Sequence, residues 1–326
     1  MRPSFVLFLL GLSALLSTPR RASAQSTAMT VEIVLDENSF LPGEDLPVGV
    51  RISNLTGRTV TLGSTNNWLS FYVESKTGEI VGRLGPVPVE GEFTLQSSKA
   101  GTKWWNIQPY FQLEQAGTYL VFAELRLPDW NLRLVSDPVT FTLQGSSKLW
   151  EMPFGVPLTA DQTNAAPTNP EIRRYALQTA MRLKDKKLYA RVTDEGENHI
   201  YKVVLLDRFL SFATPQQQLD SKSQLHVLFQ TGGSMYTYCV VNPNGELVSR
   251  QHHEIAPNSR PRLSKNTNGS ITILGGKRFP SFTDIPPWDP PPTAARIDTN
   301  SPPKTNAPPA DTKKKSKAAK QKKATE

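Results

Sequence analysis

Cysteine is almost absent from this chain of 326 residues, which contains only Cys239. A single cysteine excludes a disulfide within the chain, so burial of apolar side chains must stabilise the fold. Cys239 lies in an apolar, strand-like run, and neither His nor Arg flanks it in the sequence. Because a reactive thiolate needs a basic neighbour, we expect a buried thiol, with an intermolecular disulfide as the alternative.

Motifs of known catalytic chemistry are absent as well. The sequence has no Gly-x-Ser-x-Gly elbow, no His-Glu-x-x-His and no glycine-rich loop of the kind that holds phosphate. Of its four histidines only His252 and His253 are adjacent, and in a strand they would point to opposite faces. His252 and Glu254 would share a face, but we expect a solvent-facing strand end there. The sequence therefore predicts no metal, no cofactor and no enzymatic activity.

An apolar run long enough to cross a membrane is missing too. The run from Phe5 to Leu16 is shorter than the roughly 20 residues that a spanning helix needs. It follows Arg2 and precedes the small residues 22–24, which is the layout of a secretory signal. We expect residues 1–24 to be cleaved, the mature chain to be periplasmic or extracellular, and membrane contact to occur only through this signal. Arg20 and Arg21 leave an uncleaved anchor or a membrane-lying helix as the alternative.

Positive charge is concentrated at the two ends of the chain. The net charge is +8, of which three charges lie in residues 1–24 and a net six lie from Pro291 onward. The middle of the chain is therefore close to neutral. A nucleic-acid-binding core should itself carry a basic face, so we expect no specific nucleic-acid partner.

Residues 28–144 alternate between apolar and polar side chains, as antiparallel strands with one buried face do. Examples are the runs 31–36, 46–53, 69–74 and 139–144, with turn signals between them and no sustained helical period. About seven or eight short strands in about 115 residues are typical of a two-sheet sandwich.

Two sequence patterns in this region resemble bacterial Ig-like domains. One is Pro42-Gly43-Glu44 before a strand, followed by Asn54-Leu55-Thr56; the other is the late run 116–121. In that run Tyr119 occupies the place of a tyrosine corner. Macroglobulin-type domains and the BsuPI proteinase-inhibitor family are similar. The resemblance implies an Ig-like β-sandwich, and the inhibitor family implies an inhibitory loop, for which we would choose residues 82–100.

We predict a linker at residues 145–170, although apolar side chains at 149, 150, 152, 154 and 156 suggest contact with a module. Strand-like runs resume in residues 171–280, a second antiparallel module, where the segment Arg173 to Leu183 is open to a helical alternative. Asn244-Gly245 and Asn268-Gly269 predict two hairpins with positive φ at both central residues. These hairpins resemble β-propeller blades, but the module is too short to close a ring.

Residues 286–326 form a tail rich in proline and lysine, with almost no apolar side chain to bury. Such a composition predicts disorder. Its lysines would attract anionic envelope polymers without specificity; they are Lys313, Lys314, Lys315, Lys317, Lys320, Lys322 and Lys323. The alternative is a solubilising tail without a partner.

Aromatic residues of the first module are the best candidates for recognition of an unknown protein or glycan partner. They are Trp104, Trp105, Tyr110 and Trp130. The fold class is thus all-β, an Ig-like β-sandwich followed by a second antiparallel β module and a disordered tail. We expect an exported binding or scaffolding protein of the cell envelope, and the alternatives are a proteinase inhibitor and a glycan-binding or glycan-hydrolysing protein.

Overall fold

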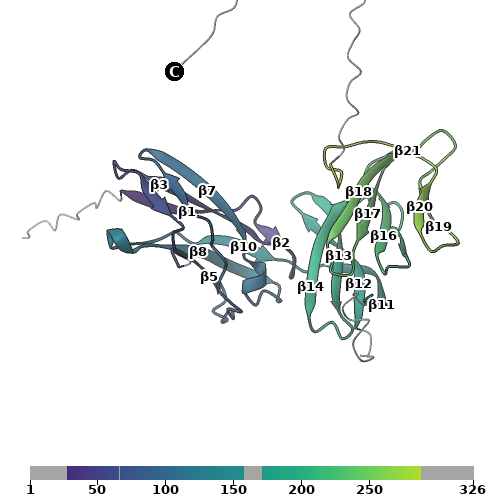
Figure 1. The fold of residues 1–326 in the computed structure, drawn as a ribbon. Coiled ribbons are helices and arrows are strands. Elements are labelled where there is room, and N and C mark those ends of the chain that lie inside the picture. Colours follow the sequence, from purple (N-terminus) through teal and green to yellow (C-terminus); the bar gives the residue numbers. More distant parts are fainter. Residues whose placement is uncertain (1–27, 66, 158–170, 288–326) are drawn as a thin grey trace, which may run out of the picture. The chain divides into compact units, whose positions relative to one another are not determined.

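The computed structural model describes residues 28–65, 67–157 and 171–287. The regular elements of these residues are β-strands and two short 3-10 helices, η1 (Gln108–Tyr110) and η2 (Pro128–Trp130). The all-β class predicted from the alternating pattern is therefore confirmed (Figure 1). The expected signal segment and the tail from residue 288 onward lie outside the described residues.

The first module consists of two facing sheets and a small strand pair (Figure 1). The antiparallel three-stranded sheet contains β1 (Met29–Val34), β3 (Pro47–Asn54) and β7 (Lys99–Asn106). The five-stranded sheet contains β2 (Ser39–Phe40), β10 (Val139–Leu143), β8 (Gly117–Leu127), β5 (Leu69–Ser75) and β9 (Leu132–Val135). β4 (Val60–Leu62) pairs with β6 (Phe93–Leu95). Only β2 joins its neighbour, β10, in the parallel sense.

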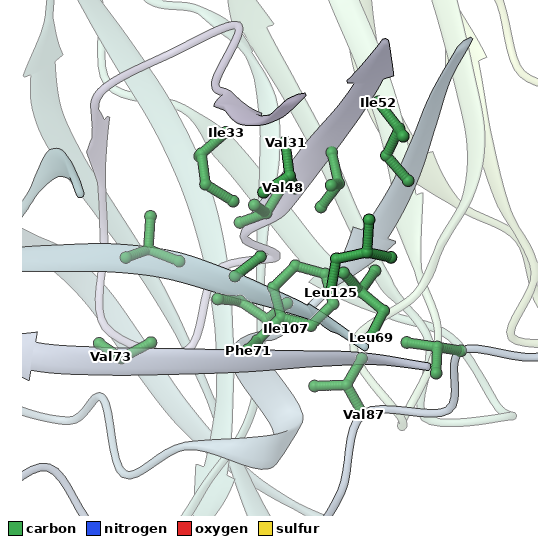
Figure 2. Packing of buried hydrophobic residues seen from close by; sticks show 14 of the residues in the cluster. Val31, Ile33, Val48, Ile52, Leu69, Phe71, Val73, Val87, Ile107 and Leu125 are labelled. Carbon is green, nitrogen blue, oxygen red and sulfur yellow. The ribbon is translucent and has the colours of Figure 1, made fainter. Parts of the chain in front are cut away.

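The core of this module follows from the period of two in its strands. In β1, Val31 and Ile33 are buried and pair with Ile52 and Val50 of β3. In the opposite sheet, Phe71 is completely buried on β5. Figure 2 shows side chains of the two sheets converging on one apolar layer. The alternation of buried and exposed side chains therefore gives each sheet one apolar face, and the apolar faces of the two sheets pack against each other, as expected for a sandwich.

Two polar contacts fix this core in place. The hydroxyl of Tyr119 donates to the carbonyl oxygen of Gln115, four residues earlier in the chain, at 2.9 Å. The indole Nε1 of buried Trp68 donates to the carbonyl oxygen of Val89 at 2.8 Å. Both contacts satisfy a polar atom on a buried aromatic side chain.

The second module has two larger antiparallel sheets and one hairpin. The first sheet contains β11 (Ser147–Gly155), β12 (Ile172–Arg182), β13 (Asp185–Asp194) and β14 (Ile200–Arg208). The second contains β15 (Gln216–Leu219), β16 (Leu225–Gln230), β17 (Met235–Val241), β18 (Leu247–Glu254) and β21 (Lys277–Arg278). The hairpin is β19 (Arg262–Lys265) with β20 (Ile271–Leu274).

Part of the segment expected as a linker belongs to this module. Residues Ser147–Gly155 form β11, which pairs with β12 along its length. Phe154 is buried and stacks on Tyr175 with ring centroids 4.1 Å apart. The apolar side chains that interrupt this polar segment are thus those of an edge strand. β12 covers the segment for which a helix was the alternative, so that alternative does not apply.

The second sheet of this module is covered on both faces, which explains its continuous apolar runs. Side chains of one face, such as Val227 and Cys239, pack into the sandwich core. Those of the other face, such as Leu228 and Tyr238, pack against the hairpin, with Leu263 on β19 and Ile271 on β20. A strand buried on both sides loses the polar half of its alternation.

Both Asn-Gly sequences occur in hairpin turns, but the turns are longer than predicted. Five residues separate β17 from β18 and β19 from β20. Only the glycines, Gly245 at φ +83° and Gly269 at φ +80°, take positive φ among the residues of these two turns. The longer loop requires positive φ at one residue, whereas a two-residue turn of the expected type requires positive φ at both of its residues.

Candidate functional site

The two adjacent tryptophans expected in a binding face occupy opposite sides of β7. Trp105 packs edge-to-face on Trp68 and Phe71, with ring centroids 6.2 and 5.7 Å apart. Trp104 is 43% exposed, and its ring lies over Gly49, where a Cβ atom would approach the indole to 3.1 Å. Trp105 is therefore part of the core packing, and Trp104 is the member of the pair that faces solvent.

The other two aromatics of that expected face lie on the 3-10 helices. Tyr110 packs partly against the first core, whereas Trp130 is 41% exposed. Among the described residues, no ring-to-ring contact joins Trp104, Tyr110 and Trp130 to one another. The expected tail lysines lie outside the described residues.

The loop chosen for proteinase inhibition is largely held by the first module. Residues 82–100 include β6 and the start of β7. Within this range Val87 and Val89 are buried, and Leu84 is 63% exposed. The exposed portion around Leu84 is attached through its backbone N–H, which donates to the carbonyl oxygen of Tyr110 at 2.9 Å.

His252 lies between two carboxylates and not at a solvent-facing strand end. Its Nδ1 is 2.8 Å from Oδ1 of Asp284, and its Nε2 is 3.3 Å from Oδ2 of Asp207. Asp284 also accepts from Nη2 of Arg278 at 2.7 Å. The described residues contain no group of three or more His, Cys, Asp or Glu arranged to hold a metal ion. This histidine cluster ties the segment after β20 to β18.

The pKa values of the two adjacent histidines, His252 and His253, are shifted in opposite directions. Hydrogen bonding to Asp207 raises the pKa of His252, and the hydrogen bond to Asp284 adds to this shift. Burial lowers the pKa of His253 to about 4, and the nearby positive charges of Arg278 and His252 lower it further. Within the described residues, Nε2 of His253 has no hydrogen-bond partner. These environments thus favour the protonated form of His252 and the neutral form of His253.

We expect these shifts to give a stability maximum near pH 6.5, the ordinary histidine pKa. Above pH 6.5, His252 loses its proton in the unfolded chain but retains it in the folded chain. The stabilisation that protonated His252 gives the fold is therefore lost as pH rises through its raised pKa. Between about pH 4 and 6.5 the unfolded chain binds a proton that folded His253 does not, so stability falls as pH falls. Urea unfolding at pH 4 to 9 would show both limbs.

Glutamine variants would separate the two limbs of that pH profile. His252→Gln should flatten the alkaline limb and leave the acid limb intact. His253→Gln should reduce the slope of the acid limb, to which His226, whose pKa is also lowered by burial, still contributes. An unchanged alkaline limb in the His252 variant would contradict the assignment.

Cys239 is completely buried in the strand β17. Burial raises the pKa of its thiol to about 12. Arg250 lies opposite it in the β17–β18 register and acts to lower this pKa, but the effect of burial is larger. Because the thiolate is the nucleophilic form, this thiol is poorly suited to nucleophilic chemistry.

A cavity of about 540 Å³ opens in the second module beside β11. Its apolar walls come from Trp150 on β11, Leu177 on β12 and Phe209, which follows β14. Leu177 and Phe209 are buried, whereas Leu149 and Phe212 at its edge are 44% and 84% exposed. Apolar core packing is therefore continuous with apolar surface at this opening.

Local backbone structure explains how these side chains reach the opening. The β11–β12 register shifts between Lys148 and Trp150, so Leu149 is an unpaired bulge residue at a sheet edge. The backbone N–H of Phe209 donates to the carbonyl oxygen of Lys186 at 2.7 Å, and the ring packs edge-to-face with Phe229. The bulge thus brings Leu149 to the edge of the cavity, and the loop after β14 places Phe209 between the core and the cavity.

Polar groups at the cavity are few. They are the hydroxyls of Ser211 and Thr214, the amide of Gln217 and the ammonium of Lys186, whose Nζ lies 5.9 Å from the Phe209 ring centroid. With its oxygen turned to the indole, the Gln217 amide accepts from Nε1 of Trp150 at 3.3 Å. Apolar walls with a few polar groups are the usual composition of a small-molecule site.

A hollow of about 370 Å³ in the first module offers a contrast. Its lining includes Ser75, Glu79, Gln112, Glu114 and Gln115, so polar and acidic side chains dominate it. The cavity beside β11 is therefore the better candidate for an apolar ligand. The sequence analysis did not predict this cavity. The sequence feature that points to it is the set of apolar side chains within the predicted linker.

Comparisons with known proteins identify no family. No protein-family model and no curated protein sequence matches the chain. Among solved structures, Spo0M, a sporulation control protein from Bacillus subtilis, is 12% identical, with 56% of this chain and 90% of that chain covered and a TM-score of 0.27. A similarity of this size does not establish a shared fold or function. Across the residues that the structure describes, none of the helices has the length and apolarity required for a membrane span.

Proposed function

We propose that this protein is an exported binding protein and that the cavity beside β11 receives a small ligand with an apolar body. The observation that carries the proposal is the exposure of Leu149 and Phe212 next to the aromatic walls of a 540 Å³ cavity. Large apolar side chains that are exposed together around a hollow commonly mark a binding site. The volume is within the range of about 300–1,000 Å³ that is typical of ligand pockets.

The walls favour a ligand with a flat or chain-like apolar part. Trp150 and Phe209 offer aromatic surface, which contacts rings through stacked or edge-to-face geometry. Leu177 closes the inner side and is completely buried. The hydroxyl and amide groups at the rim would orient the ligand by hydrogen bonds. Removing this apolar surface from water supplies the binding free energy.

Export is supported by the signal-like residues 1–24, and an envelope location follows from it. The lysine-rich end of the chain would add loose attraction to anionic polymers. The tyrosine-corner hydrogen bond of Tyr119 supports an Ig-like interpretation of the first module, which would then serve as a scaffold or a contact for a protein partner.

Alanine at Trp150 is expected to weaken binding of a neutral fluorescent probe, N-phenyl-1-naphthylamine, by at least about tenfold. The substitution removes the largest aromatic wall of the cavity while leaving the Leu177 and Phe209 side intact. The measurement is the fluorescence titration of the probe into the full chain. A wild-type protein that does not bind the probe would contradict the proposed function.

Trp104→Ala provides the control, because Trp104 is a tryptophan of the first module that does not line the cavity and is 43% exposed. It should bind the probe as the wild type does. Equal losses in the Trp104 and Trp150 variants would show that the probe responds to the loss of any tryptophan and would contradict a specific cavity. Circular dichroism of both variants would check that the fold is retained.

A further inference from the structure

We infer that the ligand of this cavity is an apolar carboxylate, with its anionic end at Lys186; the inference rests on the proposed binding function. Among the described residues, Lys186 is the only charged residue that lines the cavity. These lining residues include no Asp or Glu, so together they carry a net positive charge. A neutral ligand would leave this ammonium without a counter-charge next to an apolar wall.

The position of Lys186 makes an anion at the mouth favourable. Its ammonium is held near the face of Phe209, at 5.9 Å from the ring centroid. Its side chain is half-buried, so its charge is less screened than that of a fully exposed lysine. A carboxylate that enters with its apolar part between Trp150 and Phe209 would bring its charged end to this ammonium.

The neighbouring charges are already paired with one another. Asp185 pairs with Lys187 at 3.7 Å and with Arg208 at 3.4 Å. Lys148, just before the bulge, pairs with Glu151 at 2.7 Å and with Glu197 at 2.8 Å. Among the described residues, Lys186 forms no ion pair of its own. The nearby carboxylates are thus paired with other cations, so the ammonium of Lys186 is free to pair with an anionic ligand.

The inference is tested with a matched pair of probes of nearly the same shape, the anion 1-naphthylacetate and its neutral amide, 1-naphthylacetamide. Calorimetric titration of the full chain at pH 7 should show at least about tenfold tighter binding of the carboxylate. Lys186→Gln removes the charge and keeps a polar side chain that is one atom shorter, so the preference should fall towards unity. Lys184→Gln is the control, since Lys184 is exposed and does not line the cavity.

The possible outcomes separate the two claims. Equal affinity for both probes, unchanged by Lys186→Gln, would overturn the carboxylate inference and leave the cavity as an apolar site. Absence of binding by both probes and by N-phenyl-1-naphthylamine would contradict the proposed function itself. A carboxylate preference that falls equally in the Lys184 and Lys186 variants would overturn the assignment to Lys186, because it would indicate general surface charge. Weaker carboxylate binding at high salt is expected and would support the ion pair.

Discussion

Replacement of Trp68 by alanine should destabilise the first module by about 3–5 kcal/mol, the usual cost of removing a buried aromatic side chain. Trp68 is only 2% exposed and packs edge-to-face on Phe93 and Trp105, with ring centroids 5.8 and 6.2 Å apart. The substitution would leave a large cavity between the sheets. It would also leave the carbonyl oxygen of Val89 without the indole hydrogen bond.

Denaturation by urea, with hydrogen exchange measured on peptides from each module, would assign the loss to the first module. Trp68→Phe retains an aromatic ring and loses the indole N–H, so we expect a cost of about 1–2 kcal/mol. Trp104→Ala, on the exposed face of β7, should cost no more than about 1 kcal/mol. A Trp68→Ala protein as stable as the Trp104 variant would show that this packing does not stabilise the module.

Alanine at Asp284 should destabilise the second module by about 2–4 kcal/mol and release the segment 277–287 from β18. The Asp284 carboxylate is 3% exposed and accepts from His252, from Arg278 and from the backbone N–H of Ser281. Without it, the guanidinium of Arg278 loses its counter-charge and the imidazole of His252 loses a hydrogen-bond partner. The pKa of Asp284 is lowered because these hydrogen bonds outweigh the opposing effect of burial.

Hydrogen exchange of the backbone amides in β21 and of Ile285 would report the release directly. The backbone N–H of Ile285 donates to the carbonyl oxygen of Arg250 at 3.0 Å, and the N–H of Arg250 donates back to Ile285 at the same distance. The Ile285 N–H should therefore be protected from exchange in the wild type. Thr283→Ala, an exposed change one position away, should alter the free energy of unfolding by no more than about 0.5 kcal/mol. Protection of Ile285 that persists in the Asp284 variant would contradict the role assigned to this carboxylate.

Sequence analysis could predict the features that depend on residues close together in the chain. Alternation of side chains in β1 and β3 predicted sheets, because adjacent residues of a strand point to opposite faces. Gly245 and Gly269 predicted turns, because glycine takes positive φ without steric cost. Two strand-rich modules are the accumulated result of these local preferences.

Only the tertiary structure could decide which distant residues meet. His252 contacts carboxylates that are 45 and 32 positions away in the sequence. The sequence predicts a linker around Trp150 because Gly, Ser, Pro, Thr and Asn dominate residues 145–170, whereas pairing with β12 makes Trp150 an edge-strand residue. The cavity combines residues of β11, β12 and the segment after β14, none of which shows a binding motif by itself. Contacts of this kind depend on strand order and sheet packing, and local alternation is compatible with many strand orders.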